Sequence, residues 1–373
     1  MLTMVEALAQ PRWHTVLRSR ALLAVRGGEA RTFLQGLVTN DMADVRPGAP
    51  AHVAFLNRQG RVLCDAHVIA SVARPGEFML DCDRAVRPAL HSHLRKFRLR
   101  VDVEFDELDE DALAVVALGG PYVAAADAFP AGFAGAEGVV VERDPRRPEL
   151  GYRALLPHAA LGGVALGCGG SREVPEGMYQ LTRTLLAVAD GEHDMPSAEA
   201  LPAEANLDIH RAISFKKGCY LGQELTARTH FTGVVRKRIL PVVRLAEGWD
   251  APIDVRSEWP RALAHLPAWC KQPVVAHALR AMEELPGPEA PLCAPAASVS
   301  LAADGSSLGK LRSSLCGTFG LAVLRFEKLL ADEGAQLACA EGEGGEAQPS
   351  SEEAVRLHAI LPPWIRPAQK PSS

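Results

Sequence analysis

The residues best suited to chemistry in this chain surround one cysteine. In the run FKKGCYLGQE, Phe215–Glu224, the thiol of Cys219 follows Lys216 and Lys217 and lies between two glycines. A thiolate, not a thiol, binds metal or attacks an electrophile, and neighbouring ammonium groups favour the thiolate. Glycines allow positive φ and the close approach of another backbone. The pattern indicates an exposed metal ligand or nucleophile, and the alternative is a β-turn around a buried cysteine.

The other cysteines are too scattered to suggest a metal site held by this chain alone. None of them forms a C-x-x-C pair, whereas a four-thiolate cluster or a zinc site normally has short ligand spacings. We therefore expect any cluster to be shared with a partner protein. The scatter also fits a reducing compartment better than a disulfide framework. The cysteines are Cys64, Cys82, Cys168, Cys219, Cys270, Cys293, Cys316 and Cys339.

Other residues of the same run are predicted to support Cys219. Glu224 and Arg228 are four residues apart, so on a helix they would form an i,i+4 ion pair. His230 is an alternative second metal ligand, although a lone histidine after a cysteine is more often a surface residue. A cysteine–histidine hydrolase is a weaker alternative, because no third orienting group can be identified. The predicted supporting residues are Lys216, Lys217, Gly218, Tyr220, Gly222, Gln223, Glu224 and Arg228.

The composition is that of an ordinary globular protein. Of the 373 residues 48% are hydrophobic, and the net charge of −5 argues against a general nucleic-acid or anionic-membrane surface. The apolar run over residues 111–141 is interrupted by Pro121 and Pro130, so no membrane-spanning helix is predicted. We expect neither a secretory signal nor a clear transit peptide near the N-terminus.

Hydrophobic periodicity predicts an α+β fold around the cysteine run. The turn Asn57–Gly60 joins two strands and predicts a β-hairpin. From Gly233 on, strand patterns dominate, which predicts a small C-terminal barrel or sandwich. The expected helices are 30–37, 86–97 and 178–189. The expected strands are 21–25, 52–56, 61–70, 77–82, 101–105, 113–118, 139–142, 234–245, 297–302, 308–312 and 321–326.

These elements predict three domains and a tail. The first α+β domain is expected over 14–110, and a second over 111–230 with the cysteine run at its end. A β-barrel is expected over 231–340, with a Pro-rich loop insertion at about 247–292 to which no function is assigned. Residues 341–373 are expected to form an acidic, flexible tail.

Three stretches of the sequence resemble one protein family. They are Phe33–Asp41, the Gly-Arg-x-Leu-x-Asp hairpin within Asn57–Asp65, and the segment from Leu201 through the cysteine run to His230. The chain is similar to the iron–sulfur cluster assembly branch of the aminomethyltransferase (glycine-cleavage T-protein) and folate-binding family, above all to a mitochondrial member. The resemblance covers about Val16–Arg244 and Ala297–Lys328. It implies two intertwined antiparallel-sheet α+β domains and a C-terminal barrel around a central hole.

The resemblance also implies a function. Cys219 would contribute one thiolate to a transient 2Fe-2S cluster that is shared with an A-type iron–sulfur carrier protein. Together the two proteins would mature 4Fe-4S client proteins. Lys216 and Lys217 would favour the thiolate, and Gly218 and Gly222 would let the partner's backbone approach. The implied location is the mitochondrial matrix, with the bacterial cytoplasm as the alternative.

Two other functions remain as alternatives. The first is folate-dependent aminomethyl or one-carbon transfer with tetrahydrofolate, but the family's paired aspartates appear here as Cys64 and Asp65, and its pterin-binding glutamate is replaced by Leu185. A site built for such hydrogen bonds loses much affinity without them. A non-enzymatic role is therefore expected. A residual pocket would be lined by Asp65, Arg183, Glu204 and Asn206. The second alternative is an interaction scaffold without any ligand.

Overall fold

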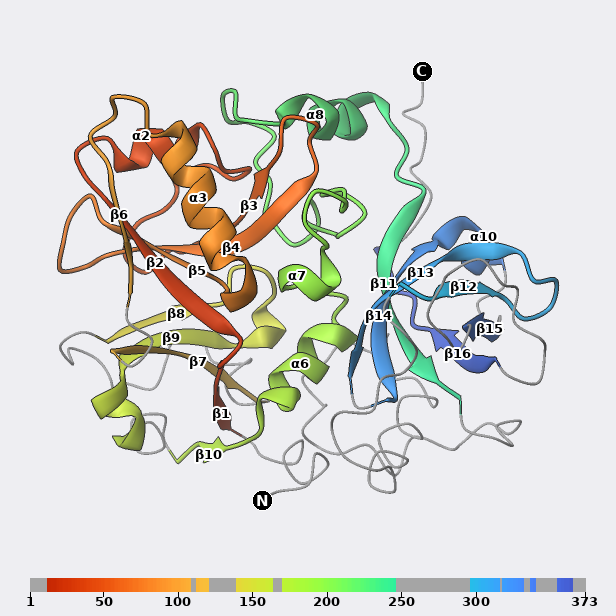
Figure 1. The fold of residues 1–373 in the computed structure, drawn as a ribbon. Coiled ribbons are helices and arrows are strands. Elements are labelled where there is room, and N and C mark those ends of the chain that lie inside the picture. The colour runs from red at the N-terminus through yellow and green to blue at the C-terminus, as the bar shows by residue number, and fades with distance from the viewer. Residues whose placement is uncertain are drawn as a thin grey trace.

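The computed structural model describes residues 12–108, 112–120, 139–163, 170–245, 296–315, 317–331, 336–339 and 354–364. Two five-stranded sheets and a closed six-stranded barrel form the molecule, with α8 (Gln223–Thr232) at one end between the first sheet and the barrel (Figure 1). The predicted α+β class with a C-terminal barrel is therefore confirmed. None of the described helices is long and apolar enough to cross a membrane.

The first sheet carries the predicted hairpin. Its strands are all antiparallel and follow the order β3 (Ala51–Leu56), β4 (Val62–Ala70), β5 (Phe78–Asp83), β2 (Arg20–Arg26) and β6 (Glu104–Glu107). One face packs against α2 (Ala30–Gln35) and α3 (Arg87–Phe97), which follows the 3-10 turn η1 (Arg84–Val86). The amide of Gly60 donates to the carbonyl of Asn57 at 3.0 Å and closes the hairpin turn as its sequence predicts.

The second sheet packs against the other face of the first. Its order is β10 (Arg172–Glu173), β1 (Trp13–Val16), β7 (Leu113–Gly119), β9 (Tyr152–Pro157) and β8 (Val140–Arg143). Short 3-10 turns η3 (Pro148–Leu150) and η4 (His158–Gly163) flank β9, and α6 (Glu176–Leu185) packs on the sheet. The expected first domain over 14–110 needs correction here, because β1 pairs with β7 and thus joins the second sheet.

The barrel closes with a strand that the sequence prediction had placed in the tail. The order around it is β11 (Lys237–Arg244), β14 (Phe319–Arg325), β13 (Ser307–Leu315), β12 (Ser298–Leu301), β15 (Gln336–Cys339) and β16 (Val355–Ala359), and α10 (Phe326–Ala331) follows β14. Because β16 pairs with both β11 and β15 and buries Leu357, the expected tail over 341–373 is wrong at these residues. The rest of that tail up to 353 and beyond 364, and the expected insertion at 247–292, lie outside the described residues.

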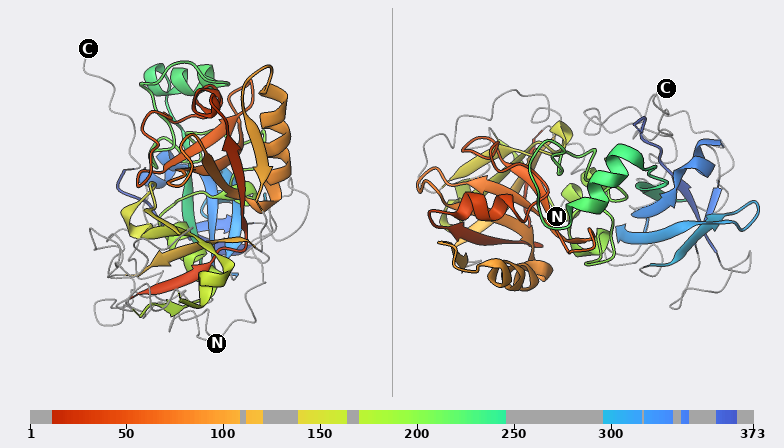
Figure 2. Two further views of the ribbon diagram at one scale, coloured as in Figure 1. Left: turned by 90° about the vertical axis from the view of Figure 1, so that its left-hand side faces the viewer. Right: turned by 90° about the horizontal axis from the view of Figure 1, so that it is seen from above.

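One apolar cluster joins the hairpin, the connecting segment and the barrel. It includes Leu56 and Val62 of the hairpin strands, Tyr220 of the cysteine run, and Ile239 and Leu321 of the barrel. The short helix α7 (Gly191–Asp194) lies in the segment that connects α6 to the cysteine run. Seen from above, α8 lies between the two α+β units and the barrel (Figure 2). The cysteine run is thus fixed where the first sheet meets the barrel.

Candidate functional site

Cys219 is exposed, as the predicted role of its thiolate as a metal ligand requires. The other three cysteines that the structure describes, Cys64, Cys82 and Cys339, are buried. A Cβ built on Gly218 would meet no atom within 4 Å, so the space beside the sulfur-bearing residue is open. Solvent and a second protein can therefore reach this stretch of backbone.

The cysteine loop is tied at both ends to the exit of α2. The amide of Ser214 donates to the carbonyl of Thr39 at 3.0 Å, and the amide of Leu221 donates to the carbonyl of Gly36 at 3.0 Å. Between these ties Tyr220 is buried, and burial raises its pKa to about 12. The loop therefore presents Cys219 outward from a fixed base, and the sequence stretches 33–41 and 213–229 that resembled one family lie in contact.

The ammonium group of Lys217 is held by backbone carbonyls at the end of α2. Its ammonium group donates to the backbone carbonyls of Gln35, Val38 and Asn40 at 2.7–2.8 Å and lies over the ring of Tyr220. Burial lowers the pKa of Lys217 to about 8. Lys217 thus satisfies carbonyls at and just after the end of α2, as a lysine near a helix C-terminus can. Its effect on the Cys219 thiolate stays a prediction. Lys216 is exposed.

The two glycines flanking the cysteine have different roles. Gly222 has a φ of 79°, and a Cβ there would overlap the carbonyl oxygen of Asn57 at the hairpin turn. Gly60, with a φ of 78°, faces the same contact from the hairpin side. Gly222 therefore serves internal packing, not the predicted approach of a partner. It brings the hairpin of Asn57–Asp65, another stretch that resembles the family, against the cysteine loop. Only Gly218 keeps the space that the prediction requires.

The residues that follow Gly222 form α8, which begins at Gln223. Glu224 and Arg228 are both exposed and one turn apart, but among the described residues no ion pair joins them, so the predicted pair is not formed. His230, in the last turn, stacks on Phe215 with ring centroids 3.5 Å apart. Over the same described ranges, no group of three or more His, Cys, Asp or Glu side chains is placed to hold a metal ion.

Asp65 is fully buried and bonded within the protein. A hydrogen bond of 2.9 Å joins its Oδ2 to Nε2 of His52, and the amide of Gly191 donates to Oδ1 at 3.0 Å. Burial alone would raise the pKa of Asp65, but the hydrogen bond with His52 and nearby charges hold it below its usual range. One carboxylate oxygen thus bonds β3 within the hairpin and the other joins the hairpin to α7, so Asp65 does not line a pocket as predicted.

Asn206 and Glu204 do not join a central pocket either. The amide of Asn206 donates to the carbonyls of Ala187 and Ile239 at 3.1 and 2.9 Å, with φ at 61°. From a buried position, it ties the segment that follows α6 to β11 of the barrel. Glu204 lies in a groove between α8 and the barrel. The predicted set of Asp65, Arg183, Glu204 and Asn206 therefore does not converge.

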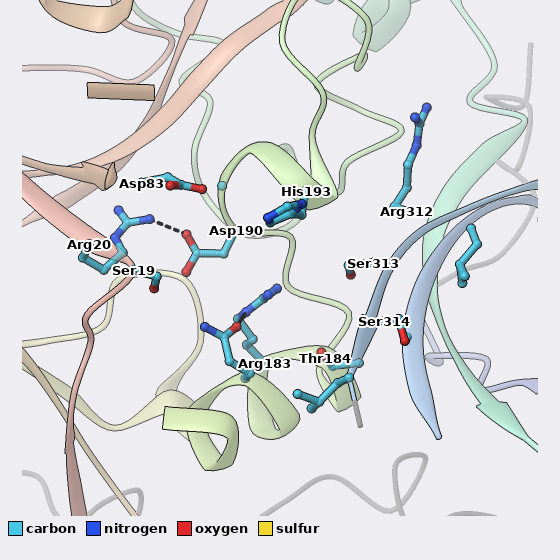
Figure 3. Close-up of a pocket in the computed structure, with 15 residues that line it drawn as sticks. Ser19, Arg20, Asp83, Arg183, Thr184, Asp190, His193, Arg312, Ser313 and Ser314 are labelled. Atoms are coloured by element: carbon cyan, nitrogen blue, oxygen red, sulfur yellow. Dashed lines mark hydrogen bonds and ion pairs between the residues drawn. The ribbon is translucent and has the colours of Figure 1, made fainter. Parts of the chain in front are cut away.

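A cavity of about 350 Å³ does lie at the junction of the three parts, and Arg183 lines it (Figure 3). Arg20 and Asp83 from the first sheet, His193 of α7 and Arg312 of β13 line it as well. Figure 3 shows the Arg183 side chain beside Asp190, and Arg183 itself pairs with Asp194. Its guanidinium is therefore already neutralised by the protein.

An ionic layer that the sequence analysis missed lies between the two sheets. Asp81 of β5 accepts a hydrogen bond from Arg20 Nε at 2.7 Å and pairs with Arg153 of β9. Nearby, Asp144 pairs with Arg146 at 2.7 Å. All five side chains are buried. The sequence does contain a sign of this layer, because a charged residue lies within an apolar strand: Asp81 lies within the strand FMLDCD. Further members are Tyr179, Arg183, Asp190 and Asp194.

Comparison with known proteins agrees with this arrangement. Residues 236–367 match the family described as CAF17, C-terminal beta-barrel domain. The solved aminomethyltransferase T of the glycine cleavage system from Bartonella henselae superposes with a TM-score of 0.63 over 97% of this chain and 88% of that chain, at 14% identity. That likeness concerns the fold.

Curated relatives are similar over most of the sequence. The human protein "Iron-sulfur cluster assembly factor IBA57, mitochondrial" is 35% identical over 340 residues, which span 87% of this chain and 82% of the relative. A homologue from Mycosarcoma maydis is 33% identical over 83% of this chain and 73% of the relative. The homologue from Pyricularia oryzae is 41% identical over 64% of this chain and 59% of its own length. The chain therefore belongs to the family of the iron–sulfur cluster assembly factor IBA57.

Proposed function

We propose that this chain is a mitochondrial iron–sulfur cluster assembly factor in which Cys219 is one ligand of a cluster shared with a carrier. Its partner would be an A-type carrier protein whose cysteines supply the other thiolates of a 2Fe-2S cluster. The pair would act in the matrix on 4Fe-4S client proteins. The names of the relatives support the assembly role, and the exposure of Cys219 on a fixed loop supports its part in the chemistry.

The local geometry suits a ligand that must reach across an interface. To bind iron, the thiol of Cys219 gives up its proton, and exposure lets water take it. The backbone ties at Ser214 and Leu221 already order the loop, so less conformational entropy is lost when a partner binds. The open side at Gly218 leaves room for the partner's backbone.

Two other described cysteines are poor donors by comparison. Cys64 and Cys82 are buried in the first sheet, where burial raises the pKa of Cys82 to about 12 and raises that of Cys64 as well. Both therefore stay protonated and away from solvent. Of the described thiols, Cys219 is the one whose surroundings allow coordination of an external cluster.

The test is anaerobic cluster reconstitution with and without a purified A-type carrier, followed by visible absorption and circular dichroism. The wild-type chain should stabilise a cluster only with the carrier, and Cys219→Ser should abolish this shared spectrum. Cys339→Ala, which removes a buried barrel thiol, is the matched control and should keep it. A stable cluster on this chain alone, or a shared spectrum unaffected by Cys219→Ser, would contradict the proposal.

The folate-dependent alternative has weaker support. The central cavity offers space, but Asp65 does not reach it and Arg183 is paired with Asp194. Tetrahydrofolate binding stays a prediction from sequence resemblance. The ligand-free scaffold predicts that Cys219→Ser leaves function in cells unchanged, so the same variant separates it from the assembly role.

A further inference from the structure

A pocket of about 260 Å³ lies between α3 and the hairpin of the first sheet, apart from the cysteine loop. One stripe of α3 forms a wall of it, because three of the lining residues follow Ala89 at i+3, i+4 and i+7 and share its face of the helix. The opposite wall comes from Phe55 of β3, Cys64 of β4 and Ser197 after α7. The pocket shares no lining residue with the central cavity and is therefore a separate site.

The floor of this pocket is apolar. Phe55, Val86 and Leu90 are buried members of the core beneath α3. Burial raises the pKa of the Cys64 thiol, which therefore stays protonated and acts as a small apolar group. An apolar cavity of about 150 Å³ takes up benzene, so a volume of about 260 Å³ holds about ten non-hydrogen atoms. The space fits a small apolar molecule and is too small for a helix or strand of another protein.

One polar atom in the wall of α3 lacks a partner. Nε2 of His93 is buried, and no group in the described part of the chain hydrogen bonds it. A buried polar atom without a hydrogen bond costs free energy, so most such atoms in native proteins are paired. Ring contacts with Phe55 and Phe97 hold the imidazole in place. Burial, and to a lesser extent Lys96, lowers the pKa of His93, so the ring is neutral at pH 7 and can donate one hydrogen bond from Nε2.

Lys96 adds a positive charge to the same wall. It is exposed, and among the described residues no carboxylate forms an ion pair with it, whereas Arg87 and His91 of the same helix both pair with Glu107. None of the residues that line the pocket is acidic. A carboxylate accepts hydrogen bonds and pairs with an ammonium group, so it would satisfy His93 and Lys96 together.

We propose that this pocket binds a medium-chain carboxylate. The alkyl chain would lie against Phe55 and Leu90, and the carboxylate would accept a hydrogen bond from His93 Nε2 and pair with Lys96. Ligand pockets usually combine such an apolar lining with a few polar groups that fix orientation. One cation and one neutral donor match a single negative charge, whereas a nucleotide carries more charge and more polar atoms than this floor can accept. The site goes beyond cluster assembly and does not depend on Cys219.

The first test is calorimetric titration of the full chain with octanoate, which has about the number of non-hydrogen atoms that the volume allows. We expect a dissociation constant on the order of 0.1–1 mM and a higher melting temperature with the ligand present. From hexanoate to octanoate each methylene should tighten binding about fourfold, and longer acids should gain no more once the pocket is full. Affinity that keeps rising through dodecanoate would indicate adsorption on an open surface and overturn the inference.

The second test fills the pocket. Ala89 is exposed and lines it, so Ala89→Trp should occupy the space and weaken octanoate binding about tenfold or more. The control Ala85→Trp adds the same side chain at an exposed position of η1 outside the pocket, and should bind within about twofold of wild type. Melting temperatures without ligand check that both variants fold. Cys219→Ser should bind octanoate as the wild type does, and equal binding by the two tryptophan variants would overturn the inference.

The third test concerns the carboxylate. Lys96→Glu should weaken octanoate binding about fivefold, and Arg95→Glu, the same charge change at an exposed neighbour outside the pocket, should alter it by about twofold at most. His93→Phe keeps the ring contacts but removes Nε2, and should weaken octanoate about threefold. Octan-1-ol has the same chain without the charge, so Lys96→Glu should leave its binding unchanged. An equal loss for octanoate and octan-1-ol in Lys96→Glu would show that the wall does not recognise a carboxylate and overturn the assigned ligand class.

Discussion

Polar and charged side chains are buried and paired in the ionic layer between the sheets, whereas the cysteine loop exposes a lysine and a thiol. In the layer, Asp81, Arg20 and Arg153 are buried and satisfy one another. In the loop, Lys216 and Cys219 are exposed, and only Lys217 is drawn inward. The first region uses charge to fix the packing of two sheets. The second holds an exposed thiol on a loop whose ends are fixed by backbone hydrogen bonds.

The pKa values within the layer show how complete this neutralisation is. Burial alone would raise the pKa of Asp144, but Arg146 and its hydrogen bonds hold it well below its usual range. Burial, with Arg153 and Arg146 beside it, lowers the pKa of His67 to about 3. The histidine therefore stays neutral, and the aspartates stay charged. Removing one member of such a layer leaves its partner buried and unpaired.

Asp81→Asn should have the largest effect on stability. It leaves the guanidinium groups of Arg20 and Arg153 without their shared carboxylate, so we expect a loss of about 3–5 kcal/mol in the free energy of unfolding. Urea denaturation followed by circular dichroism measures it. Cys219→Ser, in the exposed loop, should change the same quantity by less than about 0.5 kcal/mol. Comparable losses in the two variants would remove the contrast between the regions.

Lys217→Met should have an intermediate effect. The substitution keeps an apolar stem of similar length but removes the donor to three backbone carbonyls, so we expect a loss of about 1–3 kcal/mol. Lys216→Met, at the exposed neighbour, is the control and should be near neutral. Thermal denaturation compares the two. If both lysines behave alike, the assignment of Lys217 to the end of α2 is incorrect.

Glu142→Gln should have the smallest effect and depend on pH. Glu142 of β8 is buried near Asp144 but hydrogen bonds only the amide of Gly48, at 3.0 Å, and burial raises its pKa from 4.5 to about 7. Between these pH values the folded state binds the extra proton, so the stability that Glu142 contributes is lost as pH rises through about 7. Glutamine should therefore stabilise the protein by roughly 1–2 kcal/mol at pH 8.

The same variant should approach wild-type stability as pH falls to 4.5 and below, because Glu142 then becomes protonated in the unfolded state as well as in the folded state. Melting temperatures of both proteins from pH 5 to pH 8 test this trend. A constant difference over that range would mean that Glu142 titrates normally. A difference that grows as pH rises would instead sharpen the contrast with Asp144, which has the arginine partner that Glu142 lacks.

The sequence by itself determined the local elements and the family. Hydrophobic spacing predicted α2, α3 and the hairpin strands, and turn chemistry predicted the bend at Asn57–Gly60. These features depend on residues close in the chain, so a local pattern carries them. The cysteine run also indicated an outward donor, since its basic and glycine-rich surroundings lack the apolar pattern of a core strand.

Only the tertiary structure decided which charged residues face solvent and which complete the core. Lys217 meets Gln35 across 182 positions, and Asp65 meets Gly191 across 126. The same holds for β1, which joins the second sheet, and for β16, which closes the barrel. A single sequence does not reveal such distant partners, because a lysine or aspartate in a motif has the same local pattern whether it tunes a thiol or satisfies a remote backbone. The energy of burying a charge depends on the partner that it finds, and folding supplies that partner.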